Sequence, residues 1–211
     1  MLAADKEFRT ENQKFLRQTF FEKRILFLEG VMTYDYCNDP TMPMGWPTSP
    51  RGVMDQLFYL DNLEEKPIRL FIDSPGGIAD TCLLLYDTIN SLRSPVYTIA
   101  RGIVASAAVP ILAAGKRGKR FIFPNSKTMI HLPHGGAQGD PKDMAIALKQ
   151  FEKVKDTYVR ILSELSGTPT GELEVLIERD HWMSADETIE KGFADHKIVS
   201  LSDIASEENI K

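Results

Sequence analysis

The stretch that decides the fold is IRLFIDSPGGIADTCLLLYDTINSLRSPVYTIARGIVASAAVPILAAG, residues 68–115. It shows the same pattern twice: an apolar run, a turn rich in small residues, and a helical segment. The runs at 68–72 and 96–100 have the β-branched and aromatic content of buried strands. Each precedes a segment with helical character, at 79–92 and 107–114. This alternation predicts an α/β domain with largely parallel strands.

The alternation continues on both sides of this stretch. Asp140 and Pro141 open the longest expected helix, because Asp caps a helix and Pro is tolerated in its first turn. That helix is longer than a domain of this size can cover, so we expect it to reach toward another subunit. The other expected elements are an amphipathic helix at 5–22, a strand at 24–28, an exposed proline-rich loop at 38–50, a helix at 53–63, strands at 120–123 and 127–130, a capping-box helix at 185–192, a last strand at 196–199 and a polar tail.

Length, charge and cysteine content exclude several classes of protein. A chain of 211 residues fits one domain. A net charge of −5 disfavours a nucleic-acid partner. Cys37 and Cys82 are too few for a disulfide framework or a zinc site, which favours a reducing compartment. The N-terminus lacks a signal core, and no apolar run approaches the roughly 20 residues of a membrane span. We therefore expect a cytoplasmic protein.

Ser106 is the only hydroxyl in the apolar, small-residue tract at 102–114. A polar atom in such a place must be hydrogen-bonded or used. One interpretation is a helix N-cap, since Ser accepts from the first unpaired N–H groups. The other is a nucleophile at a strand-to-helix turn, where the helix N-terminus stabilises a developing oxyanion. The tract alone leaves both interpretations open.

Activation of a serine needs a base and a carboxylate that orients it. His131 follows the strand expected at 127–130, and strand ends are where α/β enzymes gather site residues. Asp180 is an attractive acid, although 30 carboxylates are available. His131 and His134 lack a third ligand for a metal site. The order Ser, His, Asp and the absence of Gly-x-Ser-x-Gly argue against the hydrolase elbow fold and not against the chemistry.

The turn Ser74-Pro75-Gly76-Gly77 ends one expected strand and precedes a helix. Its glycines can bring backbone N–H groups close to an anion, although such a turn is more often only a tight turn. The pattern lacks the Lys-Ser or Lys-Thr of a phosphate-binding loop, and the chain has no dinucleotide fingerprint. Nucleotide binding is therefore not expected.

Together these segments resemble the proteolytic subunit of the Clp protease family over roughly residues 24–200. The match rests on several motifs in order and at compatible spacing. They are Ser74-Pro75-Gly76-Gly77, Tyr86-Asp87-Thr88, Gly102, the run at 112–120, Pro124-Asn125-Ser126, Met129-Ile130-His131 with Pro133, the run at 135–139, Arg179-Asp180 and Met183-Ser184-Ala185.

The resemblance implies a serine endopeptidase that works by acyl transfer, and it assigns roles to individual residues. The implied catalytic set is Ser106 as nucleophile, His131 as general base and Asp180 as orienting carboxylate, with an oxyanion hole of the backbone N–H groups of Gly77 and Ala107. The implied contact residues are a substrate-pairing strand at Gly135, Gly136, Ala137 and Gln138, and a charged pair, Glu178 and Arg179, between rings.

The resemblance also implies a fold and an assembly. The fold is a repeated β-β-α superhelix of the Clp and crotonase type, with an N-terminal segment at 1–23, one peptidase domain at 24–211 and a protruding helix-strand handle at about 132–165. The assembly is a pair of stacked seven-membered rings that receives unfolded polypeptide from a partner ATPase of the AAA+ class. ATP is then used by that partner, and this chain needs no cofactor or metal.

Several positions depart from the usual family pattern and suggest a divergent paralogue. Ala107 and Ala108 stand where Met and Gly are usual, Pro110 is unusual, and Arg69 replaces an aromatic residue of the ATPase-docking groove. Two alternatives follow. The chain is a weakly active or non-catalytic ring subunit that scaffolds an active paralogue, or it is a crotonase-type acyl-CoA hydratase or isomerase. The retained Ser106, His131 and Asp180 favour the active peptidase.

Overall fold

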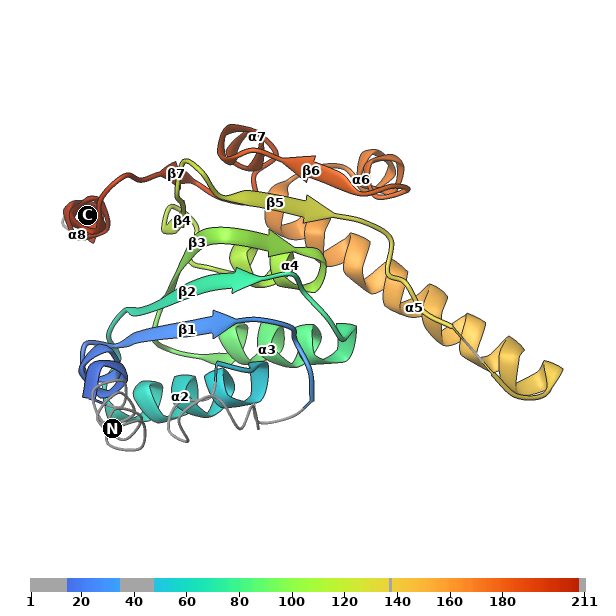
Figure 1. Ribbon diagram of the computed structural model, residues 1–211, viewed down its shortest axis with the longest axis horizontal. Coiled ribbons are helices and arrows are strands. Elements are labelled where there is room, and N and C mark those ends of the chain that lie inside the picture. Colours follow the sequence, from blue (N-terminus) through green and yellow to red (C-terminus); the bar gives the residue numbers. More distant parts are fainter. Residues whose placement is uncertain (1–14, 35–47, 137, 209–211) are drawn as a thin grey trace, which may run out of the picture.

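A seven-stranded sheet forms the centre of the molecule (Figure 1). The computed structural model describes residues 15–34, 48–136 and 138–208. The five strands β1, β2, β3, β4 and β7 lie side by side in that order, and all are parallel. The strands are β1 Ile25–Glu29, β2 Ile68–Ser74, β3 Val96–Ala105, β4 Arg120–Ile122, β5 Lys127–Ile130, β6 His181–Met183 and β7 His196–Lys197. The predicted α/β class with largely parallel strands is confirmed.

Strand β3 is longer than the sequence indicated, and its length positions the site. The expected strand ended at Ala100, but β3 continues to Ala105. Its first half pairs with β4 and its second half pairs with β5. The register against β2 shifts around Gly102, where Asp73 Oδ1 accepts a 3.1 Å hydrogen bond from Ile103 N. Glycine at such a bulge marks an irregular strand rather than the end of one.

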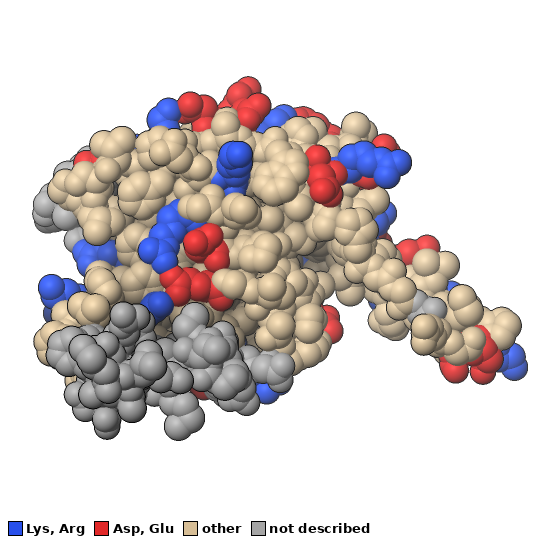
Figure 2. All heavy atoms as spheres, viewed as in Figure 1, with Lys and Arg blue, Asp and Glu red and all other residues tan. Residues whose placement is uncertain are grey.

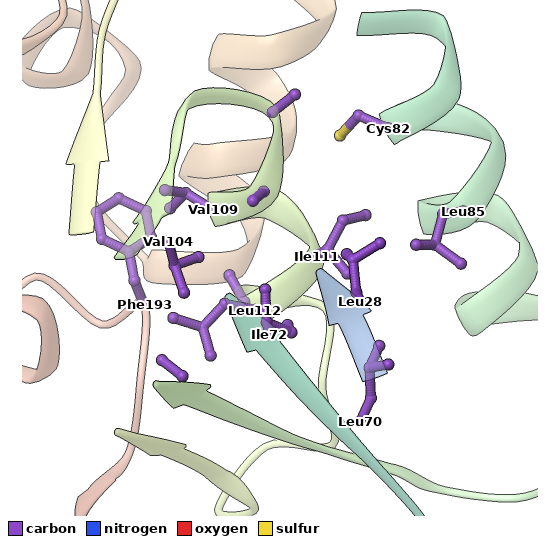
Figure 3. Close-up of a cluster of buried hydrophobic side chains, with 14 of the residues drawn as sticks. Leu28, Leu70, Ile72, Cys82, Leu85, Val104, Val109, Ile111, Leu112 and Phe193 are labelled. Atoms are coloured by element: carbon purple, nitrogen blue, oxygen red, sulfur yellow. The ribbon is translucent and has the colours of Figure 1, made fainter. Parts of the chain in front are cut away.

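Helices α2, α3 and α4 cover one face of the sheet. Apolar side chains of β1 and β2, including Leu28, Leu70 and Ile72, face Leu85 of α3 and Ile111 of α4 (Figure 3). All five of these side chains are essentially inaccessible to solvent. The helices are α2 Pro50–Leu63, α3 Ala79–Ser91, α4 Val109–Ala113, α5 Pro141–Ser166, α6 Thr170–Leu176, α7 Ala185–Glu190 and α8 Leu201–Glu208.

The opposite face of the sheet carries an aromatic cluster. Phe27, Phe71, Ile99 and Phe121 occupy successive registered positions across β1, β2, β3 and β4. Ile204 of α8 packs into the same cluster. The sequence predicted a polar tail after the last strand, and that prediction was wrong because α8 is amphipathic and buries Ile204.

Of the two segments expected near the N-terminus, one is as predicted over its described part and the other differs. Residues 15–22 are helical, as the amphipathic pattern predicted, while positions 5–14 lie outside the described residues. Of the loop expected at 38–50, residues 38–47 also lie outside the described residues. Its described end is buried rather than exposed, and Pro50 begins α2 with Ser49 as its N-cap. Proline suits the first position of a helix, where its missing N–H costs nothing. The division into segments at 1–23 and 24–211 stays a prediction.

Helix α5 extends away from the body of the molecule (Figure 1). Asp140 caps it as predicted, accepting hydrogen bonds from the backbone N–H groups of Lys142 and Asp143. Its buried residues all lie in its C-terminal half, and Figure 2 shows acidic and basic side chains among the other residues of its free end. Met144, Ile146 and Leu148 are exposed on the free half. Among the described residues, no helix is long and apolar enough to cross a membrane.

Candidate active site

The sheet topology brings four separate segments together at one edge of the sheet, the one formed by the carboxyl ends of its parallel strands. Ser106 follows β3 and His131 follows β5, and these two strands are parallel neighbours. Asp180 comes directly before β6, which pairs antiparallel with β5, so it lies at the same end. Gly77 follows β2, whose Ser74 is in register with Val104 of β3. The carboxyl ends of parallel strands thus collect the predicted residues, as in other α/β enzymes.

Ser106 directly follows β3 and is the first residue of a short 3₁₀ helix, Ser106–Ala108, that leads into α4. Its φ of 54° lies in the left-handed region, which is strained for a residue other than glycine. The side chain caps no helix, because Ala105 holds the cap position and makes no side-chain cap bond. The N-cap interpretation was therefore wrong. The single helix expected at 107–114 is also wrong, since the 3₁₀ turn precedes a five-residue α4.

His131 contacts both other members of the predicted set. Its Nε2 lies 2.8 Å from Ser106 Oγ, within hydrogen-bonding distance. Its Nδ1 lies 3.4 Å from Asp180 Oδ1, which is too long for a good hydrogen bond, and this buried nitrogen has no hydrogen-bond partner among the described residues. The Asp180 side chain is 56% exposed, against 14% for His131. The nucleophile and base are therefore within hydrogen-bonding distance, while the carboxylate lies at ion-pair distance from Nδ1.

Burial lowers the pKa of His131 below its ordinary value of 6.5. Neighbouring His134, whose ring centre lies 4.5 Å away, lowers it further, while the charge of Asp180 opposes both effects. The lowered pKa keeps the imidazole neutral near pH 7. A neutral imidazole can accept a proton from Ser106, whereas a protonated one cannot.

The pH profile of peptide hydrolysis follows from this shift. The base must be neutral to act, so kcat/KM should rise with pH and reach half its plateau below pH 6.5. Replacing His134 by Gln removes one of the causes that lower the pKa, and it should move this midpoint to higher pH. The measurement is kcat/KM against pH for both proteins on a fluorogenic peptide. An identical midpoint in the His134→Gln variant would contradict this account.

The turn after β2 packs directly against the Ser106 turn. Ser74 is fully buried, and its Oγ donates to Gly30 O at 2.6 Å and accepts from Gly76 N at 3.1 Å. A Cβ on Gly76 would lie 2.8 Å from Ala107 N, and one on Gly77 would lie 2.3 Å from Met32 O. Only glycine allows these approaches. The backbone N–H groups of Gly77 and Ala107 make no hydrogen bond within the described chain, and both residues border the cavity beside Ser106.

A cavity of about 400 Å³ opens beside these groups. Ser106, Ala107 and His131 border it, and its wall is mostly apolar. The wall is formed by α3, α4 and α5 together with the segment after β1. Burial raises the pKa of the Cys82 thiol, one of the wall residues, to about 12, so this group stays a neutral, small apolar side chain. The size and the mostly apolar wall of the cavity suit an apolar group next to Ser106.

The remaining predicted contact residues are the segment at 135–138 and the pair Glu178 and Arg179. Gly135, Gly136 and Gln138 form no strand, because none of the described strands pairs with them, and Ala137 lies outside the described residues. Pairing of this segment with an extended substrate stays a prediction. Glu178 and Arg179 are exposed and border a second hollow with His131 and Asp180. No group of three potential metal ligands occurs in the part of the chain that the structure describes.

Sequence reasoning missed one polar group beside the nucleophile. Tyr158 of α5 borders the cavity, and its hydroxyl donates a 3.2 Å hydrogen bond to Ser106 O. A signal was present, because Val154, Tyr158 and Ile161 follow helical spacing and all three line the cavity. The pattern indicates a buried helix face, but it does not indicate what that face contacts.

Comparison with known proteins identifies similar sequences. A sequence model of the family described as Clp protease matches residues 47–200. A protein of Streptococcus salivarius named ATP-dependent Clp protease proteolytic subunit is 42% identical over 147 residues, which cover 68% of this chain and 75% of the relative. A Carsonella ruddii protein with the same name is 34% identical over 192 residues, covering 91% of this chain and 92% of the relative. The family match includes Ser106, His131 and Asp180.

Proposed function

The chain belongs to the Clp protease family and is a serine-type endopeptidase subunit, and from this premise we propose that Ser106, His131 and Asp180 are its catalytic residues. The observation that carries the proposal is the 2.8 Å contact between Ser106 Oγ and His131 Nε2 at the edge of an apolar cavity. This is the geometry that a nucleophile and its base require. The Asp180 carboxylate lies 3.4 Å from the other ring nitrogen of His131.

The chemistry is acyl transfer to serine. Ser106 Oγ attacks the carbonyl carbon of a peptide bond while His131 Nε2 takes its proton. His131 then gives that proton to the leaving amine as the C–N bond breaks, which leaves an acyl group on Ser106. Water attacks this ester in the second half of the reaction, again with His131 as base. Asp180 favours the tautomer with hydrogen on Nδ1 and stabilises the protonated imidazole.

We assign to the backbone N–H groups of Gly77 and Ala107 the role of stabilising the oxyanion of the tetrahedral intermediate. Both come from turns at the same sheet edge as Ser106, and neither N–H is used within the described chain. Unpaired donors beside a nucleophile stabilise negative charge as it develops. A backbone donor does not depend on the side chain, so Ala107 serves this role although Met is usual there.

The apolar cavity supports a preference for an apolar side chain on the acyl side of the cleaved bond. The segment at 135–138 is proposed to pair with extended substrate through main-chain hydrogen bonds, which suits low sequence specificity. Unfolded polypeptide is then the substrate class, because a folded chain cannot present an extended strand to this edge.

Family membership implies an oligomer that works with Clp ATPases, and the finer assembly is proposed here. We place the chain in stacked heptameric rings, homomeric or mixed with a paralogue, with α5 at the contact between rings. The unburied half of α5, with Met144, Ile146 and Leu148 exposed, supports this role. The charged pair Glu178 and Arg179 is assigned to the same contact. ATP is used by the AAA+ partner in the cytoplasm, and this chain needs no cofactor.

A labelling experiment tests the proposed nucleophile. The purified chain, alone and with candidate partner subunits, is treated with a fluorophosphonate, and the adduct is located by mass spectrometry. We expect a single adduct on Ser106, because the reagent reacts with serines activated by a base. The adduct should be absent in Ser106→Ala and strongly reduced in His131→Ala.

The control separates activity from assembly. Ring formation of each variant is measured by native mass spectrometry, since truncation at the site should leave the core packing intact. An assembled wild-type ring that takes up no label would overturn the proposal and favour a non-catalytic scaffold subunit.

A further inference from the structure

The carbonyl group of Ser106 has an uncommon partner. Tyr158, in the C-terminal half of α5, donates a hydrogen bond of 3.2 Å to Ser106 O. The same carbonyl accepts the backbone N–H of Val109, three residues on. Burial raises the pKa of the Tyr158 hydroxyl, so the group keeps its proton and remains a donor. Two donors from two elements therefore hold one backbone oxygen.

That oxygen belongs to the same peptide group as the Ala107 N–H. A peptide group is planar, and the trans form directs its C=O and its N–H to opposite sides. The described chain has no cis peptide bonds. A rotation of the plane that moves Ser106 O therefore moves the Ala107 N–H by the same angle. Whatever fixes the carbonyl also aims the donor.

The backbone at this point needs such a constraint. Ser106 has a φ of 54°, a conformation that a residue with a side chain keeps only when its surroundings impose it. Gly76 packs against one side of the turn, so closely that a Cβ on Gly76 would lie 2.8 Å from Ala107 N. Tyr158 supplies a hydrogen bond to the turn from α5.

From this arrangement we propose that Tyr158 is a positioning residue for the oxyanion hole, which holds the Ser106–Ala107 peptide group so that the Ala107 N–H is aimed at the substrate oxygen. The inference rests on the proposed function. Its effect belongs to the transition state and the tetrahedral intermediate, because the negative charge that the N–H stabilises is absent from the bound substrate and develops as Ser106 attacks. Tyr158 makes no hydrogen bond with His131 in the described chain, and its hydroxyl donates to the backbone of the turn instead.

The test is the variant Tyr158→Phe, which keeps the ring in the cavity wall and removes only the hydroxyl. We expect kcat on a fluorogenic peptide to fall about 10-fold, less than the roughly 100-fold to 1000-fold loss seen when an oxyanion donor is removed outright. KM should stay within about twofold, since ground-state contacts are unchanged. A peptide aldehyde, whose adduct oxygen sits in the oxyanion hole, should bind about 10-fold more weakly.

A matched variant and a second readout separate positioning from packing. Tyr86→Phe removes the hydroxyl of a half-buried tyrosine on α3 that does not border the cavity, and it should keep wild-type kinetics. The midpoint of the pH profile should not move in Tyr158→Phe, because the surroundings of His131 are unchanged. Rates are expressed per site titrated to completion with fluorophosphonate, so incomplete folding does not count as slow catalysis.

The outcomes are distinguishable. Unchanged kcat and aldehyde affinity in Tyr158→Phe would overturn this inference and leave the proposed function intact. A rise in KM alone would assign Tyr158 to substrate binding and would also overturn it. Full activity in Ser106→Ala would instead overturn the proposed function.

Discussion

Replacing His131 by Ala is expected to lower kcat for peptide hydrolysis by about 10⁴-fold to 10⁶-fold. The imidazole is the only group within hydrogen-bonding distance of Ser106 Oγ among the described residues, so its loss leaves the hydroxyl at its ordinary reactivity. The remaining oxyanion donors and the cavity still bind substrate. KM should therefore change much less than kcat.

Asp180→Asn should be clearly milder than His131→Ala. The Asp180 side chain is more than half exposed, and its 3.4 Å contact with His131 Nδ1 is not a good hydrogen bond. A carboxylate in water stabilises a protonated imidazole less than a buried one does. The measurement is steady-state kinetics on a fluorogenic peptide, with ring assembly checked for each variant. His196→Gln, a change on β7 outside the site, is the control and should keep wild-type kcat.

Equal losses in Asp180→Asn and His131→Ala would contradict this ranking. They would mean that Asp180 closes onto Nδ1 when substrate binds, since catalytic hydrogen bonds often tighten only in the complex. A His131→Ala variant that retains a tenth of wild-type kcat would show that another base serves Ser106.

The order of strands and helices could be predicted because the apolar runs are short and clearly separated. The runs at 68–72 and 127–130 became β2 and β5 with small changes at their ends. The sequence placed His131 at a strand end and Ser106 at a possible strand-to-helix turn, although the strand before Ser106 was expected to end at Ala100. Parallel neighbours end on the same side whatever their loops do, but only the structure shows that β3 and β5 are neighbours.

The position of Asp180 could not be predicted in the same way. It depends on β6, a three-residue strand whose central residue, Trp182, is half exposed. Such a segment has neither the length nor the alternation that marks a strand. The left-handed conformation of Ser106 was equally hidden, because it is imposed by contacts with Gly76 and α5 that are distant in sequence. Tertiary contacts, rather than local preference, decide both features.

Gly76 illustrates how tightly these contacts constrain the site. A Cβ at this position would lie 2.6 Å from Ala105 O, 2.8 Å from Ala107 N and 2.8 Å from Ser106 Cβ. Two of these atoms are backbone, and backbone cannot rotate away as a flexible side chain can. Gly76 also has a φ of 88°, which a side chain disfavours. Relief of the overlap requires the Ser106 turn to move relative to the turn after β2.

Gly76→Ala is therefore expected to lower kcat at least about 100-fold, the loss that a displacement of roughly 1 Å causes in an oriented site. The free energy of unfolding should fall by about 2–4 kcal/mol through overpacking and backbone strain. Kinetics per titrated site and denaturant unfolding measure the two effects separately. Gly118→Ala is the matched control. Gly118 has a φ of 77°, but a Cβ at this position would have no other atom within 4 Å.

The control variant shares the backbone strain and lacks the overlap, so it should lose about 1–2 kcal/mol of stability and keep full activity. Equal kinetics in Gly76→Ala and Gly118→Ala would mean that the two turns move together, and that the contact between them does not set the geometry of Ser106. Loss of activity in Gly76→Ala alone would instead establish that contact as the constraint that holds the nucleophile in its strained conformation.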